Sequence, residues 1–448
     1  MAVERSSRSR ACVRVCIGVL ALALGAGAAR AEESAADSSA ATPAGFSYSV
    51  EVTTSFHHVS SAFFGARRDE SDPQSMHFSW GEGFTRARAN YHLASGVWGS
   101  VGGVVMGTAG ADYLKAKDVG DGRLDQLVVG VSALGASGVS LALGRQDLQV
   151  GDGFVIGDGY RDTRAALWNI PLGFYDAARA DWQRGSWHAL AFGARISPSF
   201  GGDGAYPKGI VAGGEAGWSA SDQRALALGL FSRDDRGGTR LSPRAGSVRG
   251  AIGAGAFTLS GEWVVERGTD GPVPMRGQGG HLCAHATIPA PLKPFAEVEY
   301  FRFSGDDPAT PEDEAYYPWN YRWNDWSHFY VSDLIGSTLL ADSDARIWKL
   351  ALGVTPRENT AVRLLLHRID LDTGSSYGGL PVGVGRGFAD EADLVVDQSV
   401  GDHWSGWVMG AYAVPRAAAK ALVGGSAPSG QLFVSLSYKF SAPGGAGD

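Results

Sequence analysis

Apolar and polar residues alternate along most of the chain between Phe46 and Phe440, in stretches of about ten residues. In the last stretch, residues 431–440, the positions on one side are Leu432, Val434, Leu436, Tyr438 and Phe440. Because successive side chains of a strand point to opposite faces, this period of two predicts a strand with one apolar and one polar face. About ten residues is also the length that a tilted strand needs to cross a lipid bilayer.

About eighteen such stretches follow one another along the chain. They cover residues 46–56, 83–92, 96–107, 123–133, 138–147, 175–184, 186–197, 208–219, 223–231, 246–252, 256–266, 277–288, 293–303, 343–354, 359–369, 388–398, 402–413 and 431–440. The connections between them alternate between tight links, such as Gly185 and Ser399–Gly401, and long ones, such as 148–174 and 304–342. Bacterial outer-membrane barrels have an even number of antiparallel strands, short periplasmic turns and long external loops. The pattern therefore predicts an all-β fold, a transmembrane antiparallel β-barrel of about eighteen strands.

Two alternatives to a barrel have to be weighed. Leu93–Ala111 and Leu127–Gly144 carry no charge over about the length of a membrane-spanning helix. The first contains six glycines, and both are interrupted near the middle by small residues, which favours strands and turns. A secreted soluble all-β protein is the other alternative, but it gives no reason for the alternation of tight and long connections.

The N-terminal segment predicts secretion. Four arginines in the first fourteen residues precede an apolar run from Val15 to Ala29, and Ala29-Arg30-Ala31 has the small residues that a signal peptidase recognises. We therefore expect a signal peptide at 1–31, a disordered leader at 32–45, an outer-membrane barrel at 46–440 and a short C-terminal tail at 441–448.

The composition agrees with a barrel and excludes one class of partner. Glycine accounts for 64 of 448 residues, which disfavours long helices and suits strands joined by tight turns. The formal net charge is −8, and removal of the arginine-rich signal makes the mature chain more acidic, which argues against nucleic acid. Only Cys283 remains in the mature chain, so no intramolecular disulfide can form.

Charged residues on the faces opposite the apolar positions are candidates for the pore lining. They are Arg86, Arg88, Arg179, Asp181, Arg195, Glu215, Glu262, Glu297, Glu299, Lys349, Arg363, Glu391, Asp393, Asp397 and Lys439. Acids and bases are nearly balanced, which favours weak ion selectivity or a neutral solute, because a ring of one sign selects ions of the other. Alternatively, these charges pair across neighbouring strands and only fill a wet interior.

Gly144–Leu148 is followed by Gly151–Asp158, and this run is similar to a strand-to-loop signature of the alginate export family. The segments 390–394, 401–404, 413–415 and 437–440 resemble its last three strands. The resemblance implies an eighteen-stranded monomeric barrel in the outer membrane, and members of the family pass a polyanionic uronate through an arginine-lined constriction.

The same resemblance adds residues to the hypothetical pore lining. The positions matched to the pore or loop-base charges of the family are Arg145, Asp152, Arg161, Arg164 and Arg179. Arg145 has the same parity as Leu141 and Leu143 on the expected lipid face, so it reaches the lumen only through a bulge or beyond the end of the strand.

Two loop motifs allow a binding role and a plain structural role. Asp152, Asp158 and Asp162 lie among glycines and could supply carboxylates for Ca²⁺, although Gly-Asp pairs are also ordinary turn formers. The aromatic stretch Tyr316–Trp326 could stack on sugar rings at the mouth of a pore, but a loop folded into a barrel needs the same residues for its own packing.

The remaining motifs do not indicate catalysis or a metal centre. Gly374–Gly378, around Ser376, matches the pattern G-x-S-x-G, which has meaning only on the strand-turn-helix of a hydrolase. His281 and His285 are four residues apart on one predicted strand, which separates them by about 13 Å and is too far for one metal ion. We expect no cofactor and no metal.

These observations favour a passive outer-membrane channel of the alginate-export type, not an enzyme, in a Gram-negative bacterium. It would pass small or polymeric hydrophilic solutes, a saccharide among the candidates. The expected partners are the lipid bilayer and the barrel assembly machinery, and the expected state is a monomer. A closed structural or adhesion barrel is the main alternative, and an outer-membrane hydrolase is a weaker one.

Overall fold

The computed structural model describes residues 45–65, 77–109, 119–132, 134, 138–157, 175–196, 209–235, 242–317, 319, 343–374, 376–377, 380–381 and 383–443. Eighteen long strands make up most of this part of the chain. They are β1 (Gly45–Ser60), β2 (His77–His92), β3 (Val97–Ala109), β4 (Val119–Val131), β5 (Val139–Gln146), β6 (Tyr175–Arg184), β7 (Trp187–Ile196), β8 (Gly209–Ser221), β9 (Arg224–Asp235), β10 (Arg244–Ala254), β11 (Phe257–Asp270), β13 (Gln278–Thr287), β14 (Phe295–Phe303), β15 (Ala345–Arg357), β16 (Thr360–Leu371), β19 (Gly387–Val400), β20 (Trp404–Pro415) and β21 (Ser429–Pro443). The short elements are η1 (Ala62–Gly65), β12 (Val273–Met275), β17 (Ser376–Tyr377), β18 (Leu380–Pro381) and α2 (Ala417–Val423).

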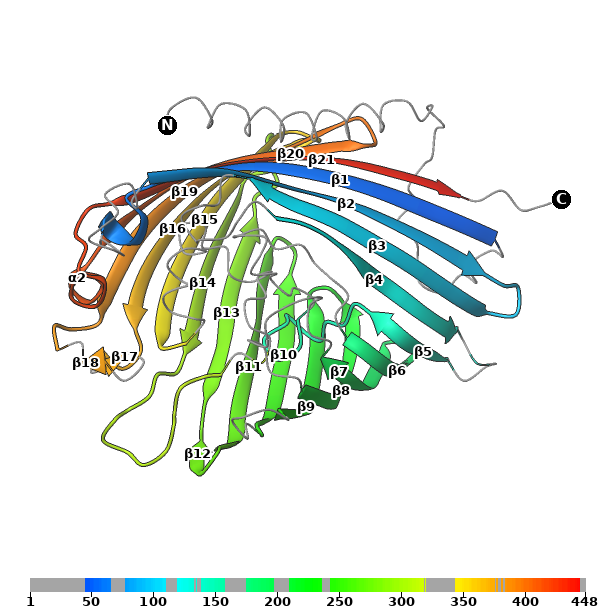
Figure 1. Ribbon diagram of the computed structural model, residues 1–448, viewed down its shortest axis with the longest axis horizontal. Helices are drawn as coiled ribbons and strands as arrows, with labels where there is room; N and C mark the ends of the chain where they lie inside the picture. The colour runs from blue at the N-terminus through cyan, green and yellow to red at the C-terminus, as the bar shows by residue number, and fades with distance from the viewer. Residues whose placement is uncertain are drawn as a thin grey trace.

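The long strands pair antiparallel with their neighbours in sequence, and the first strand closes the sheet by pairing with the last. In Figure 1 the red strand β21 lies directly beside the blue strand β1. The register of this closing pair sets Val50 opposite Phe440 and Val59 opposite Gln431. Closure satisfies the backbone N–H and C=O groups that an open sheet edge would expose to hydrocarbon. The predicted closed antiparallel barrel is therefore confirmed.

Each of the eighteen predicted stretches coincides with one of the long strands. The two uncharged stretches weighed as helices contain strands instead, because β3 occupies most of 93–111, and β4 and β5 occupy much of 127–144. Within the described residues, no helix has both the length and the apolar character needed to cross a membrane. β21 runs three residues past Phe440, so Ser441–Pro443 belong to the barrel wall and not to a separate tail.

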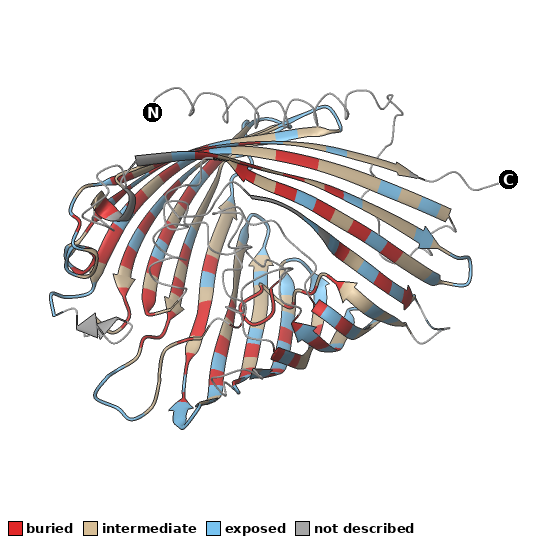
Figure 2. Cartoon of the chain, in the orientation of Figure 1, coloured by how far each residue is buried: buried red, intermediate tan, exposed pale blue. Residues whose placement is uncertain are grey.

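The two faces of each strand differ in exposure, as the alternating bands in Figure 2 show. On β9, for example, Leu228 and Leu230 are exposed on the outer surface, while Ala227 and Phe231 are buried towards the lumen. Exposed aromatic side chains lie near both ends of the outer apolar band. They are Phe46, Tyr48, Tyr91, Trp187 and Phe257 near the tight turns, and Phe56, Trp348 and Tyr412 towards the long connections. Such aromatic girdles mark the two membrane–water interfaces of outer-membrane barrels.

Apolar side chains gather on the lumenal side towards the end that carries the long connections. Phe64 of η1, Phe388 of β19 and Ala418 of α2 are fully buried members of one large cluster. A backbone hydrogen bond joins η1 to the segment after α2: the Ala427 N–H donates to the Phe64 carbonyl at 3.0 Å. By the rule that long loops are external, this packed end is the extracellular mouth.

Candidate channel constriction

The segment Asp147–Gly157, which follows β5, lies inside the barrel, and we call it the constriction segment. Its apolar side chains are buried in the lumenal cluster; they are Leu148, Val150, Phe154, Val155 and Ile156. A tight turn holds it, since Val150 N–H donates to the Ile156 carbonyl at 2.9 Å. Gly151 and Gly153 have φ values of 62° and 87°, in the left-handed region that glycine adopts without strain. The run Gly-Asp-Gly thus gives this turn its backbone.

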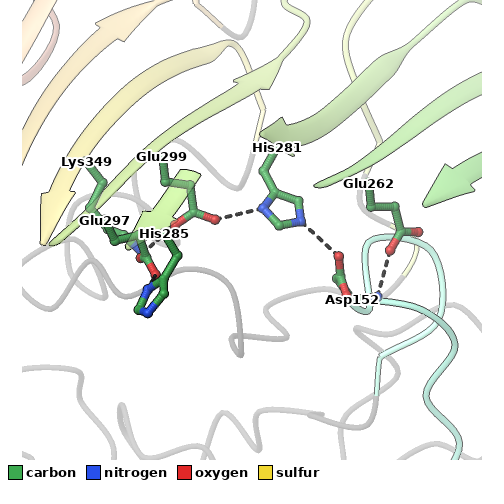
Figure 3. A network of polar contacts seen from close by, with 7 residues as sticks. All are labelled: Asp152, Glu262, His281, His285, Glu297, Glu299 and Lys349. Carbon is green, nitrogen blue, oxygen red and sulfur yellow. Dashed lines mark hydrogen bonds and ion pairs between the residues drawn. The ribbon is translucent and has the colours of Figure 1, made fainter. Parts of the chain in front are cut away.

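Asp152, at the tip of the constriction segment, reaches the lumenal wall formed by β11 and β13 (Figure 3). Its carboxylate lies 2.9 Å from Nε2 of His281, and its backbone N–H donates to the Glu262 carboxylate at 2.6 Å. Six strands, β6 to β11, separate β5 from β13 along the pairing order. The segment therefore extends across the lumen to a distant part of the wall.

A continuous polar network runs from Asp152 along the wall (Figure 3). Nδ1 of His281 lies 2.7 Å from the Glu299 carboxylate. The Lys349 ammonium on β15 bonds Glu299 and lies 3.1 Å from Glu297. Because one lysine ammonium pairs with two carboxylates, the wall around Lys349 remains acidic.

Opposite charges also meet near the start of the constriction segment. Asp125 is fully buried and lies 3.2 Å from Nε of Arg86 and 2.8 Å from Nη2 of Arg88. Arg88 also contacts Asp147 at 2.9 Å, which ties the segment to β2. The pairing of β3 with β4 shifts register at Gly102/Gly103, so Asp125 is an extra residue that a bulge turns inwards. Sequence parity missed this acid, because the bulge interrupts the period of two.

A third ion pair joins β8 and β10, which lie on either side of β9. The Arg249 guanidinium donates to Glu215 at 2.7 Å. Arg249 is also in register with Glu262, the residue that accepts the N–H of Asp152. The alternation along the strands predicts lumenal positions for Glu215 and Glu262 but does not single out Arg249.

The structure places most of the other proposed pore-lining residues on lumenal faces. Arg179 and Asp181 pair at 2.7 Å on β6, and Arg363 pairs with Asp397 at 2.8 Å. Glu391 and Asp393 are buried on the lumenal face of β19. The Arg363–Asp397 pair links β16 to β19, as the alternative of pairing across neighbouring strands expects, whereas Arg179 and Asp181 pair within β6. Arg161 and Arg164 lie outside the described residues.

Two of the proposed pore-lining residues lie on the outer surface instead, which corrects the prediction. Arg195 is exposed on β7, while Phe192 and Ile196 on the opposite face are buried in the lumenal cluster. Arg145 has the same orientation as Leu143 and pairs with the exposed Asp176 at 3.0 Å. For Arg195 the prediction failed because it assigned charge to the lumen and apolar side chains to lipid. Arg145 was included only from the family resemblance, and its parity with the exposed Leu141 and Leu143 gave its actual orientation. Near the extracellular end the lumen is apolar, and outward charges there lie beyond the hydrocarbon.

The structure shows the surroundings of three motifs that the sequence singled out. Tyr316 and Trp319 are buried, and the Tyr316 hydroxyl donates to the Phe154 carbonyl at 2.6 Å, so this part of the aromatic stretch packs onto the constriction segment. Ser376 lies in the two-residue strand β17, which pairs with β18 and not with a hydrolase sheet. His281 and His285 each contact a carboxylate of β14. Asp158 and Asp162 of the calcium hypothesis lie outside the described residues.

At the extracellular ends of β15 and β16, two aspartates have opposite surroundings. Asp372 accepts hydrogen bonds from Arg302 and Arg346, and the guanidinium groups hold its pKa below the ordinary value against the effect of burial. Asp344 is buried beside Asp372, and burial raises its pKa to about 6, although Thr373 donates hydrogen bonds to it. The pKa of Asp344 thus places its titration in a range accessible to experiment.

Replacing Asp344 with Asn should reduce the pH dependence of thermal stability between pH 5 and pH 7. A carboxyl whose folded-state pKa is raised to about 6 stabilises the fold at low pH, and this contribution is lost as the pH rises through 6. The wild type should therefore lose more melting temperature between pH 5 and 7 than D344N, as measured by circular dichroism in detergent. Asp372 does not contribute in this window because its pKa is lowered. Equal losses in both proteins would contradict the prediction.

Comparisons with known proteins identify the fold. No protein-family model matches the chain, and no curated protein matches it in sequence. The structure is similar to the crystal structure of OccK5 (OpdH) from Pseudomonas aeruginosa, with a TM-score of 0.54 and 12% identity over 89% of this chain and 98% of that chain. OccAB4 from Acinetobacter baumannii gives a TM-score of 0.58 with 8% identity, covering 89% of this chain and 98% of that chain. OpdK from Pseudomonas aeruginosa, solved with vanillate, gives 0.55 with 10% identity, covering 88% and 99% of the two chains.

Identities this low establish the fold alone. Together with the closed barrel, its apolar outer band and its aromatic girdles, they define a porin-like β-barrel of the Gram-negative outer membrane. The predicted location in the outer membrane is thereby confirmed. The similar structures are porin channels and not enzymes, and the comparisons do not place the chain in the alginate export family.

Proposed function

We propose that this protein is a passive channel through which small hydrophilic solutes diffuse across the outer membrane. The observation that supports the proposal best is the constriction segment, which crosses the lumen and contacts the wall at His281 and Glu262. A barrel with only a structural role does not need an inward loop with a charged tip. A channel uses such a loop to narrow the pore and to select by charge.

The walls around the constriction segment favour a small solute that is not polyanionic. Carboxylates outnumber cations along the described wall, where Lys349 serves both Glu297 and Glu299. A polyanion such as a uronate polymer would meet this acidic surface, so the alginate-type hypothesis receives less support than a small neutral or cationic solute. OpdK was solved with vanillate, a small aromatic acid, and a comparable molecular size suits a lumen narrowed by a folded loop.

Planar bilayer recordings test the channel directly. The purified full-length protein should give discrete conductance steps. In a salt gradient, its reversal potential should indicate a cation preference, because acidic groups line the constriction. D152N should move the reversal potential towards zero, since Asp152 is the charged tip of the constriction segment.

D390N is a matched control for D152N. Asp390 has the same charge but is exposed on the outer face of β19, where it pairs with Arg368 at 3.1 Å. Its neutralisation should leave the reversal potential unchanged. Absence of any conductance in the wild type would refute the channel and favour a closed structural barrel, and an anion preference would refute the acidic constriction.

A further inference from the structure

His367 on β16 and Glu391 and Asp393 on β19 form a buried cluster apart from the constriction network. One ligand atom from each of the three side chains lies within 4.8 Å of the others. Strand pairing places them, since His367 is in register with Glu391, and Asp393 follows two residues later on the same face. The cluster therefore belongs to the rigid barrel wall and does not depend on a loop.

Apolar residues flank the cluster on both sides along β16 and β19. Leu365 and Val395 belong to a small apolar cluster on its periplasmic side, and Ile369 and Ala389 belong to the large lumenal cluster on its extracellular side. In such a poorly solvated place, two adjacent carboxylates repel each other strongly unless they share a proton or a positive charge lies between them. A cation held by the three side chains would remove this repulsion.

Asp393 shows the need for a cation most directly. Its side chain is fully buried, and neither carboxylate oxygen accepts a hydrogen bond from a donor in the described part of the chain. It contacts Nδ1 of His367 at 3.5 Å. Arg363, on the same face of β16, is bound to Asp397 at 2.8 Å.

The neighbouring group of Cys283, Glu297 and Glu299 provides a comparison within the same wall. It also brings three possible ligand atoms together. There, however, the Lys349 ammonium lies 3.1 Å from Glu297 and also bonds Glu299, so a side chain already supplies the positive charge. Among the described residues, Asp393 has no contact with a lysine or an arginine.

We propose that His367, Glu391 and Asp393 bind a divalent transition-metal cation that links β16 to β19. The separation of 3.5 Å between His367 Nδ1 and Asp393 Oδ2 is close to the value of about 3.4 Å expected for two ligands of a tetrahedral Zn²⁺ at about 2.1 Å. One imidazole and two carboxylates suit Zn²⁺, whereas Mg²⁺ and Ca²⁺ prefer oxygen ligands alone. A water molecule can complete the fourth position.

Zinc binding to the full-length protein in detergent tests the proposal. After treatment with a chelator, calorimetric titration with Zn²⁺ should show one site, and the melting temperature should rise with Zn²⁺ concentration because the ion binds the folded state. Ca²⁺ and Mg²⁺ at the same concentrations should have much smaller effects. D393N and H367Q should each weaken Zn²⁺ binding at least about tenfold, because even loss of a second-shell contact costs about 10–100-fold.

H403A controls for surface histidines. His403 lies in the turn before β20, where its Nδ1 is 3.0 Å from the Lys439 carbonyl, and its loss should leave Zn²⁺ binding unchanged. D393N keeps the size of the side chain, and heat-modifiable electrophoresis verifies that each variant is folded. Absence of Zn²⁺ binding in the folded wild type, equal affinity in D393N, or an equal response to Ca²⁺ would each overturn the proposal.

Discussion

Replacing Gln149–Ile156 with a short Gly-Ser linker should raise the single-channel conductance by at least about twofold. The replaced residues include the buried side chains of the constriction segment other than Leu148, and also Asp152, which reaches across the lumen to His281 and Glu262. Removing them takes away the described segment that reaches across the lumen. It also removes one carboxylate from the lumen, so the cation preference should fall in the same recordings.

The control is an equivalent replacement in an exposed stretch of chain that does not line the lumen. Pro308–Pro311 is an exposed stretch in the connection after β14. Its replacement by the same kind of linker should leave conductance and reversal potential at wild-type values. If the Gln149–Ile156 replacement also conducted like the wild type while folding normally, the constriction segment would not limit flow, and the channel proposal would lose its main support.

L228R should destabilise the folded barrel by about 2–4 kcal/mol, the cost of an arginine on the lipid face at the bilayer midplane. Leu228 is exposed on the outer face near the middle of β9, in register with Val248 and Ala216. A guanidinium there has to remain in hydrocarbon or distort the bilayer around it. Reversible unfolding by denaturant in lipid vesicles measures the change.

The control for L228R is the same substitution at a position nearer the membrane–water interface. Ile252 is equally exposed to the outside, but it lies two residues from the end of β10, opposite Arg224 in the neighbouring strand. I252R should therefore cost only about 0–1 kcal/mol, as expected near an interface. L228A separates the loss of the leucine side chain from the gain of charge. Equal costs for L228R and I252R would contradict the assignment of this outer band to the bilayer.

The periplasmic and middle parts of the strands could be predicted from the local alternation of apolar and polar residues. Residues 175–184 were assigned as one stretch, and β6 has the same bounds. The outward positions of β21, among them Leu432 and Leu436, also follow from parity, because alternation of side chains is a property of any single strand. The prediction of a barrel depended on this local regularity and on the rhythm of the connections.

The orientation of residues near the extracellular end could not be predicted in the same way. Arg195 faces outwards because Phe192 and Ile196 pack into an apolar lumen. Whether a face meets lipid or a packed interior depends on what fills the interior, and residues far away in the sequence fill it. Asp125 faces inwards because of a bulge, which the pattern of a single strand does not reveal.

The amino-acid sequence by itself determined the strands, their order and the closed membrane-spanning sheet, since period-two patterning and turn composition act over a few residues. Only the tertiary structure decided the constriction and the His367 cluster. Asp152 meets His281 across 129 positions, and His367 meets Asp393 through the register of two strands. Such contacts arise when the sheet closes and a loop folds into it, so no local pattern encodes them.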